Sequence, residues 1–147
     1  MSLKISQRQI VGSIEPSLGH SITAPKFENR FAQVTGGEIT AAVEKVYDGG
    51  IKFPETLCGP SDIGDITLTR HYETERDGLP IKAVRGLVGQ AYYNITISEL
   101  NCDLQEPGRM RLYTDALLVG MTEPDGDASS GAPAAYSLTF SIGKVTE

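Results

Sequence analysis

Three segments of the chain alternate between apolar and polar residues: Gly37–Tyr47, Asp65–Tyr72 and Tyr136–Ile142. An alternation with period two is typical of a β-strand that buries one face and exposes the other. The last segment is the most regular, because large apolar residues take every second position and small hydroxyl residues take the positions between them. We therefore expect three half-buried strands in an antiparallel sheet.

The first two of these strands are joined by a long connection, Asp48–Gly64, which contains four glycines and two prolines. Hairpin loops ordinarily use about two to five residues, and a much longer connection is usually functional. This one also carries large apolar side chains that no strand or helix pattern accounts for. We predict a protruding contact loop, with the alternative that it folds back over the open end of the sheet. The expected contact residues are Ile51, Phe53, Pro54 and Leu57.

One helix is predicted over residues 79–91. Asp77 precedes it as an N-cap, Pro80 falls in its first turn, and Gly89 is placed as a terminator. Its apolar residues recur at helical spacing and are expected to pack against the core: Val84, Leu87, Val88 and Ala91.

The remaining strands complete the expected fold. The apolar phase of residues 92–104 slips by one residue near Ser98 and Glu99, which predicts a β-bulge. A turn at residues 105–108 then returns the chain into a long strand, which makes a hairpin. Six or so strands, one helix and no β–α–β alternation predict a mainly β protein: an antiparallel β-sandwich or barrel with one short α-helix at its edge and a long protruding loop.

The chain length of 147 residues suits one domain with a core of its own. Residues 1–32 contain four basic and two acidic residues, whereas residues 33–147 contain nine basic and seventeen acidic residues. We therefore divide the chain into an N-terminal arm or edge segment, 1–32, and a β-sandwich domain, 33–147. The first segment is expected either to become ordered against a partner or to be a frayed terminus with one edge strand.

The net charge of −6 and the sequence pI of about 4.9 oppose binding of nucleic acid through many phosphate contacts. No apolar stretch is long enough for a bilayer span, and the first twenty residues lack the apolar core of a secretion signal. We therefore expect a protein made in a cytosol, without membrane insertion. The two cysteines, Cys58 and Cys102, are too few for a disulfide framework, and with His20 and His71 they match no zinc spacing.

A search for catalytic patterns finds none of the usual ones. The nucleophile elbow, the zinc-protease helix and the phosphate-binding glycine loops are missing. The segment from Asp125 begins like a calcium loop, but Ser130 replaces the required glycine and Tyr136 replaces the required glutamate. We expect no catalytic residue, no cofactor and no metal.

Four short strings follow one another along the chain: Phe31–Gly37 (FAQVTGG), Tyr47–Gly50 (YDGG), Gly64–Arg70 (GDITLTR) and Pro124–Gly131 (PDGDASSG), the last ahead of the strand at Tyr136. Their order and spacing resemble the tail tube proteins of bacteriophages and the inner tubes of phage-like contractile injection systems and tailocins. The resemblance runs from Phe31 to the C-terminus. The chain departs from many relatives in having no Trp, and its first thirty residues have no clear counterpart in them.

The resemblance implies a structural protein, not an enzyme: subunits form hexameric rings that stack into a tail tube, a conduit for DNA or effectors. Its implied partners are further copies of itself, a tape measure protein, a tail terminator, baseplate or tail-tip proteins and possibly a sheath. DNA would pass through the lumen without specific binding. The implied location is the tail of a virion, assembled in the host bacterial cytoplasm.

An acidic wall would repel DNA phosphates and let a genome slide through. The candidate acidic residues for the lumen or the outer face are Glu38, Glu44, Glu99 and Asp115. The alternative function is a monomeric or small-oligomer β-sandwich binding module of a tail or surface protein. The Asp48–Gly64 loop discriminates the two, because only a tube needs its apolar residues for polymerisation.

Overall fold

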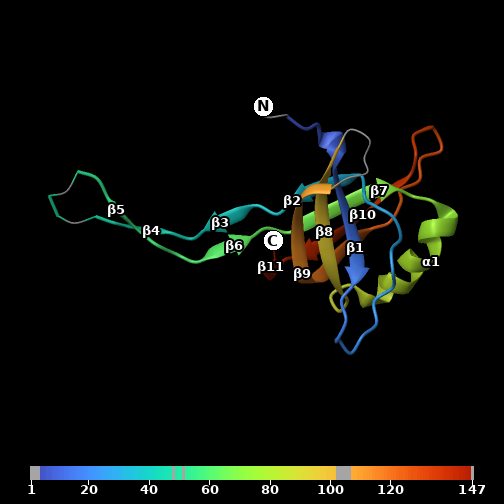
Figure 1. Ribbon diagram of the computed structural model, residues 1–147, viewed down its shortest axis with the longest axis horizontal. Helices are drawn as coiled ribbons and strands as arrows, with labels where there is room; N and C mark the ends of the chain where they lie inside the picture. The colour runs from blue at the N-terminus through green and yellow to red at the C-terminus, as the bar shows by residue number, and fades with distance from the viewer. Residues whose placement is uncertain (1–3, 48, 51, 102–106, 147) are drawn as a thin grey trace.

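The computed structural model describes residues 4–47, 49–50, 52–101 and 107–146 (Figure 1). Its elements in chain order are η1 (Gln7–Gln9), β1 (Ile10–Pro16), β2 (Gln33–Gly36), β3 (Ile39–Ala41), β4 (Glu44–Val46), β5 (Glu55–Leu57), β6 (Ser61–Ile63), β7 (Ile66–His71), α1 (Thr74–Val84), η2 (Arg85–Leu87), β8 (Tyr92–Leu100), β9 (Pro107–Thr122), β10 (Ala135–Ser141) and β11 (Lys144–Thr146).

The main sheet runs in the order β1-β8-β9-β10-β7-β2, with β11 also paired to β9, and every pairing is antiparallel. Gly12 in β1 and Phe31, just before β2, form a bridge in which each backbone N–H donates to the other residue's carbonyl. This bridge joins the two ends of the sheet, so the sheet curls into a barrel. A side chain at Gly12 would press on Leu68, because an added Cβ would lie 2.9 Å from Leu68 Cδ2. The predicted antiparallel sandwich or barrel is confirmed.

The core lies inside the curled sheet. Ile66 and Leu68 in β7 are buried and the threonines between them are half-buried, and β10 repeats this alternation. The strands predicted from the patterns at residues 65–72 and 136–142 are therefore confirmed. The largest fully buried side chains include Tyr93, Tyr136, Phe27, Phe31 and Phe140, whose rings make several edge-to-face contacts.

The β8–β9 hairpin carries the predicted bulge. Its register shifts between Ser98 and Leu100, so that burial passes from Ile97 to Leu100. A second shift lies between Tyr93 and Ile95, which the sequence pattern does not reveal. The hairpin itself is confirmed, whereas the turn and its neighbours at residues 102–106 lie outside the described residues.

The N-terminal segment contributes to the same fold. Strand β1 pairs with β8 along its whole length, and Ile14, Phe27 and Phe31 lie in the common core. The segment thus includes an edge strand of the kind expected as one alternative. The division of the chain at residue 32 stays a prediction.

The predicted helix begins and ends too late. Helix α1 spans Thr74–Val84 with Glu73 as its N-cap, and η2 follows it. Asp77, predicted as the N-cap, lies inside the helix because its carboxylate turns into the core, and Pro80 lies in the helix interior instead of the first turn. Gly89 adopts a positive φ of 89° and turns the chain toward β8, two residues after η2.

The first predicted strand, residues 37–47, is not half-buried. It forms two short strands, β3 and β4, whose residues are all exposed. The expected unstructured loop is also partly strand, because β6 pairs with β3 and β5 pairs with β4. The described residues of the segment 38–64 form a long hairpin, here called the arm, that projects away from the barrel (Figure 1). The prediction of burial is wrong because only the arm's own second half lies beside the first.

Candidate functional site

The arm leaves the barrel at two glycines that follow β2. Gly36 and Gly37 have φ angles of 93° and 78°, a region that residues with a Cβ rarely adopt. At Gly36 an added Cβ would lie 2.0 Å from the carbonyl oxygen of Asp65, so the two roots of the arm approach as closely as backbones can. The N–H of Gly37 donates to that same carbonyl, and the N–H of Gly64 donates to Glu38 O at 2.7 Å. These contacts set the direction in which the arm leaves the barrel.

Halfway along the arm the strand pairing is interrupted between β3–β6 and β4–β5. An added Cβ at Gly59 would lie 1.4 Å from the carbonyl oxygen of Ala42, and Ala42 N–H donates to Pro60 O at 3.2 Å. The interruption therefore requires a glycine at position 59. It divides the arm into a proximal and a distal ladder of three residue pairs each.

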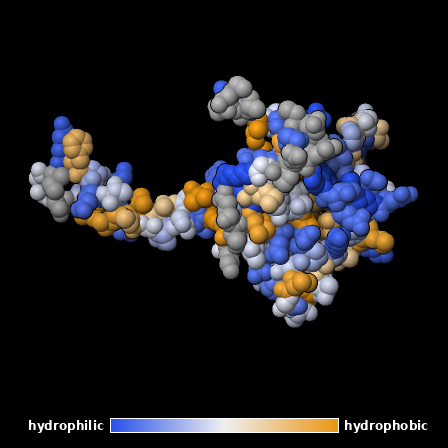
Figure 2. Space-filling view, in the orientation of Figure 1, coloured by the Kyte–Doolittle hydropathy of each residue, from blue (hydrophilic) through white to orange (hydrophobic). Residues whose placement is uncertain are grey.

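Large apolar side chains are concentrated on the arm. Among the described residues, twelve large hydrophobic side chains are exposed, and half of them belong to the arm. The most exposed on the arm are Ile39 at 74%, Phe53 at 72% and Tyr47 at 69%. Figure 2 shows hydrophobic residues along the arm and around its root. The full set is Ile39, Val43, Val46, Tyr47, Phe53 and Leu57.

The distal ladder mixes these apolar groups with carboxylates. Glu44 is paired with Leu57, and Val46 is paired with Glu55. Residues that pair directly, or lie two apart on one strand, project on the same face. One face of the distal arm therefore presents two apolar side chains and two carboxylates, suited to a partner surface that combines apolar and basic groups.

The predicted contact residues fall on the arm as follows. Phe53 and Leu57 are exposed, Pro54 is half-buried, and Ile51 lies outside the described residues. Sequence reasoning assigned Ile39, Val43 and Tyr47 to a buried face, whereas they are exposed with the others. The alternation of apolar and polar residues shows that one face of the strand is apolar. It does not show whether another part of the protein covers that face, so it could not identify these residues as exposed.

The four candidate acidic residues are not brought together. Glu38 and Glu44 are on the arm, and Glu99 is half-buried in β8. Asp115 lies in β9 with a positive φ of 54° and accepts hydrogen bonds from Ser17 and His20, the latter at 3.1 Å. His20 in turn stacks on Tyr92, with ring centroids 4.1 Å apart. Whether any of these carboxylates faces a lumen stays a prediction.

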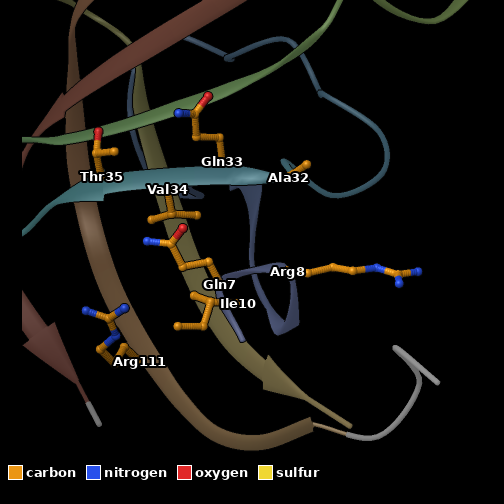
Figure 3. Close-up of a pocket in the computed structure, with 8 residues that line it drawn as sticks. All are labelled: Gln7, Arg8, Ile10, Ala32, Gln33, Val34, Thr35 and Arg111. Carbon is orange, nitrogen blue, oxygen red and sulfur yellow. The ribbon is translucent and has the colours of Figure 1, made fainter. Parts of the chain in front are cut away.

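A cleft of about 380 Å³ lies between the start of β1, β2 and β9. Figure 3 shows its lining, with Arg111 on one side and Arg8 extending away from the other residues. The remaining lining residues are Gln7, Ile10, Ala32, Gln33, Val34 and Thr35. The full set contains two guanidinium groups, two amides and one hydroxyl, and no carboxylate, imidazole or thiol.

A buried polar cluster fixes the helix to the barrel. The guanidinium of Arg70 in β7 donates to the Asp77 carboxylate, to the Glu28 carbonyl and to the Tyr136 hydroxyl, and it lies 4.3 Å from the centre of the Phe31 ring. Each buried polar group of this cluster therefore has a partner, as buried polar groups require. The cluster holds α1 and the segment before β2 in place, and its Arg70, Asp77 and Tyr136 side chains are all buried.

Electrostatics in the cluster favour the ionised carboxylate. Burial by itself raises the pKa of Asp77, but hydrogen bonds from Arg76, Tyr136 and the Glu73 N–H, with the charge of Arg70, outweigh burial and hold the pKa below its ordinary value. Burial also raises the pKa of Tyr136, as does its hydrogen bond to Asp77. A buried polar cluster in which every group is paired makes the surrounding fold more rigid.

The loop that begins like a calcium site is a local turn. Asp127 Oδ1 accepts hydrogen bonds from the Ser129 N–H and hydroxyl, at 3.0 and 2.7 Å, which lowers the pKa of Asp127. Within the described part of the chain, no group of three or more His, Cys, Asp or Glu side chains is placed to hold a metal ion. Cys58, between β5 and β6, is exposed and unpaired. No described helix has the length and apolar character needed to cross a membrane.

The same fold occurs in solved contractile injection assemblies. A chain in the baseplate of the anti-feeding prophage is 19% identical with a TM-score of 0.76, over 99% of this chain and 96% of that chain. A chain in the extended sheath–tube complex of an extracellular contractile injection system is 21% identical with a TM-score of 0.73, over 97% of this chain and 90% of that one. An Hcp protein is 11% identical with a TM-score of 0.51, over 92% of this chain and 89% of its own.

Neither a protein-family model nor a curated protein sequence matches the chain. The class that the fold defines is the tail-tube-like class found in these assemblies, which confirms the fold expected from the sequence resemblance. At these identities the likeness defines the fold alone.

Proposed function

We propose that this chain is a structural subunit that assembles with copies of itself into a tail tube. The single observation that carries the proposal is the arm: a projecting hairpin that holds half of the exposed large hydrophobic residues among those described. Exposed apolar patches mark interaction sites, and a second copy of the chain is the partner that a tube requires. The tail-tube-like fold supports the same conclusion.

The energetics agree with an arm that is completed by a partner. An isolated two-stranded hairpin is at best marginally stable in water. Burying Phe53 and Leu57 on a neighbour contributes about 1.5–3 kcal/mol each at most. Summed over the many arms of an assembly, contacts of this size hold subunits together although each one is weak.

In the proposed tube the arm, which projects from one side of the barrel, makes a head-to-tail contact with a different surface of its neighbour (Figure 1). Such contacts close into rings or continue into filaments, depending on the rotation between neighbours. A tube of stacked rings combines the two arrangements, because its subunits close into rings and the rings continue along the tube axis. Six subunits per ring is the number that the resemblance implies.

The finer assignments complete this proposal. The tube serves as a conduit for DNA or effectors in the tail of a phage-like particle, assembled in the host bacterial cytoplasm. Its partners beyond itself are a tape measure protein, a terminator, baseplate proteins and a sheath. They are supported by the fold shared with chains from a sheath–tube complex, a baseplate and a sheath/tube terminator.

The test compares tube formation by two variants with that of the unmodified chain. Negative-stain electron microscopy over a concentration series should show rings or hollow filaments for the unmodified protein and only small particles for Phe53→Asp. Leu18→Asp is the matched control, because Leu18 is 92% exposed but lies outside the arm. Circular dichroism and size-exclusion chromatography check that each variant is folded. Tubes formed equally well by Phe53→Asp would contradict the proposed role of the arm.

An unmodified protein that stays monomeric at every concentration would favour the alternative, a β-sandwich binding module. In that case Phe53→Asp should leave the oligomeric state untouched.

A further inference from the structure

The cleft beside β2 combines two basic side chains with an apolar floor. Arg8 in η1 and Arg111 in β9 line it together with Ile10 and Val34. Ile10 and Val34 pack on the core and are half-buried, so their outer sides form the floor of the cleft. In the view of Figure 3, Arg8 extends outward on one side of Ile10 and Arg111 lies on the other. The cleft therefore presents apolar surface flanked by positive charge.

The two positive charges have no counter-ion within the described part of the chain. The ion pairs found there involve other residues, and neither Arg8 nor Arg111 takes part in one. Arg8 is exposed and Arg111 is half-buried. A guanidinium suits a carboxylate, because its fork of donors matches the two carboxylate oxygens. The cleft is therefore suited to a partner that brings carboxylates and apolar side chains together.

Arg111 also lines a second hollow, at the root of the arm. This hollow of about 140 Å³ contains Ile39, Ile63 and Val145 among its lining residues. Ile39 and Val145 are both exposed. The basic and apolar surface thus continues from the cleft past Arg111, which leaves room for a segment with more than one apolar side chain.

The distal ladder of the arm carries the complementary groups. Glu44 pairs with Leu57, and Val46 pairs with Glu55. On this face the carboxylates lie on one diagonal and the apolar side chains on the other, with diagonal neighbours about 7–8 Å apart. All four residues are exposed. Neither carboxylate forms an ion pair among the described residues.

An arm does not reach the cleft of its own chain. Figure 1 shows β4 and β5 at the far end of the projecting arm, away from β2 and β9. The close backbone approach of Gly36 to Asp65, and the hydrogen bond from Gly37 N–H to Asp65 O, set this direction at the root. The arm that fits the cleft is therefore the arm of a second copy.

We propose that the cleft is the receptor for the distal arm of a neighbouring copy of this chain. Its two arginines bind the two carboxylates on the distal face of the arm, and the apolar side chains of that face cover the floor of the cleft. This inference rests on the proposed tube and names the surface that the arm contacts in it. Complementary charges fix the register of such a contact, because like charges placed together are costly.

The test reverses the charges on each side of the contact separately and then mixes the two variants. The arm variant is Glu44→Lys with Glu55→Lys, and the cleft variant is Arg8→Glu with Arg111→Glu. Each variant alone brings like charges together and should fail to assemble at concentrations at which the unmodified chain forms tubes. An equimolar mixture should form tubes again, because the arm of each variant then meets a complementary cleft on the other. Negative-stain electron microscopy and sedimentation velocity measure both results.

Lys82→Glu with Arg85→Glu is the matched control for the cleft variant. Both residues are exposed, in α1 and η2, and neither lines the cleft. The control changes the net charge by the same amount and should still assemble alone. Circular dichroism checks that each variant is folded. Arg8→Glu by itself is the second cleft variant, because Arg8 is exposed whereas Arg111 is half-buried.

Two outcomes would overturn the inference and leave the tube in place. The first is that the arm variant or the cleft variant alone forms tubes as readily as the unmodified chain. The second is that both variants are folded but their mixture stays unassembled, which would assign these charges to other contacts. An unmodified chain that stays monomeric at every concentration is a different result, which removes the proposed function and this inference with it.

Discussion

The guanidinium of Arg70 in β7 and the carboxylate of Asp77 in α1 form an ion pair that is almost wholly withdrawn from solvent, with side-chain exposures of 3% and 0%. It joins an element of the barrel wall to the only helix of more than three residues in the described chain. Burying two charges is costly, and the pair is tolerated because further hydrogen bonds satisfy both groups.

Removing one partner of this pair should destabilise the fold strongly. We expect Asp77→Ala to lower the free energy of unfolding by about 3–5 kcal/mol, because it leaves the Arg70 charge buried without its counter-ion. Chemical denaturation measures the difference. Glu75→Ala is the matched control, because Glu75 is an exposed carboxylate two residues before Asp77 in the same helix. It should change the free energy of unfolding by about 0.5 kcal/mol or less. Equal denaturation midpoints for the two variants would contradict the stabilising role of the Arg70–Asp77 ion pair.

The same carboxylate should make stability depend on acid pH. The pKa of Asp77 is lower in the folded protein than in the unfolded chain, so its contribution is present above the unfolded pKa, about 4, and is lost as pH falls through the folded pKa. We expect the stability gap between the unmodified protein and Asp77→Asn to narrow progressively below about pH 4. Urea unfolding at a series of pH values tests this, and a gap that is independent of pH would argue against it.

Tyr93 should act at the opposite end of the pH range. Burial raises the pKa of Tyr93, so the folded state keeps the phenol neutral while the unfolded chain ionises above about pH 10. Stability is therefore present below that pH and falls as pH rises above it. Tyr93→Phe removes the 2.7 Å hydrogen bond from the Tyr93 hydroxyl to Pro25 O. At neutral pH this should lower the free energy of unfolding by about 0.5–1.5 kcal/mol.

Above about pH 10 the stability gap between Tyr93→Phe and the unmodified protein should shrink, as measured by urea unfolding followed by far-UV circular dichroism. Tyr47→Phe, on the exposed arm, is the control for substitution of a tyrosine. A gap for Tyr93→Phe that stays constant to high pH would count against this role of burial.

A side chain at the root of the arm should be costly. Gly36→Ala places a Cβ in a left-handed conformation, which costs about 1–2 kcal/mol, and forces it against Asp65 O, which adds to that cost. Gly49→Ala is the matched control at the other end of the arm, where an added Cβ meets nothing within 4 Å. Thermal unfolding should show a lower midpoint for Gly36→Ala alone, and tube formation should fail with it if the direction of the arm matters.

The strands of the barrel wall could be predicted because their burial alternates with the pleat. Leu68 and Leu138 face the core and Thr67 and Thr139 face outward. The apolar positions in the sequence are therefore the positions that the structure buries. The bulge after Ser98 was visible for the same reason, since it shifts the apolar phase by one residue. Such features are local, because each residue's hydropathy reports the side on which it lies.

The helix and the arm show where local pattern stops being sufficient. Asp77 has the character of an N-cap, but its partner Arg70 lies seven residues away on another element and draws it into the core. Ile39 and Tyr47 alternate like core residues, yet no layer formed by the described residues covers them. Alternation reports that a face is apolar, whereas the covering layer comes from the tertiary structure or from another subunit.

The amino-acid pattern therefore settled the class of fold, the wall strands at residues 65–72 and 136–142 and the presence of apolar residues on the long connection. The tertiary structure decided that this connection is a paired, projecting arm, that β1 closes the barrel through Gly12 and Phe31, and that Arg8 and Arg111 line one cleft. The physical reason is that hydropathy is a property of single residues, while closure, projection and a shared cleft depend on strand pairing between residues distant in sequence.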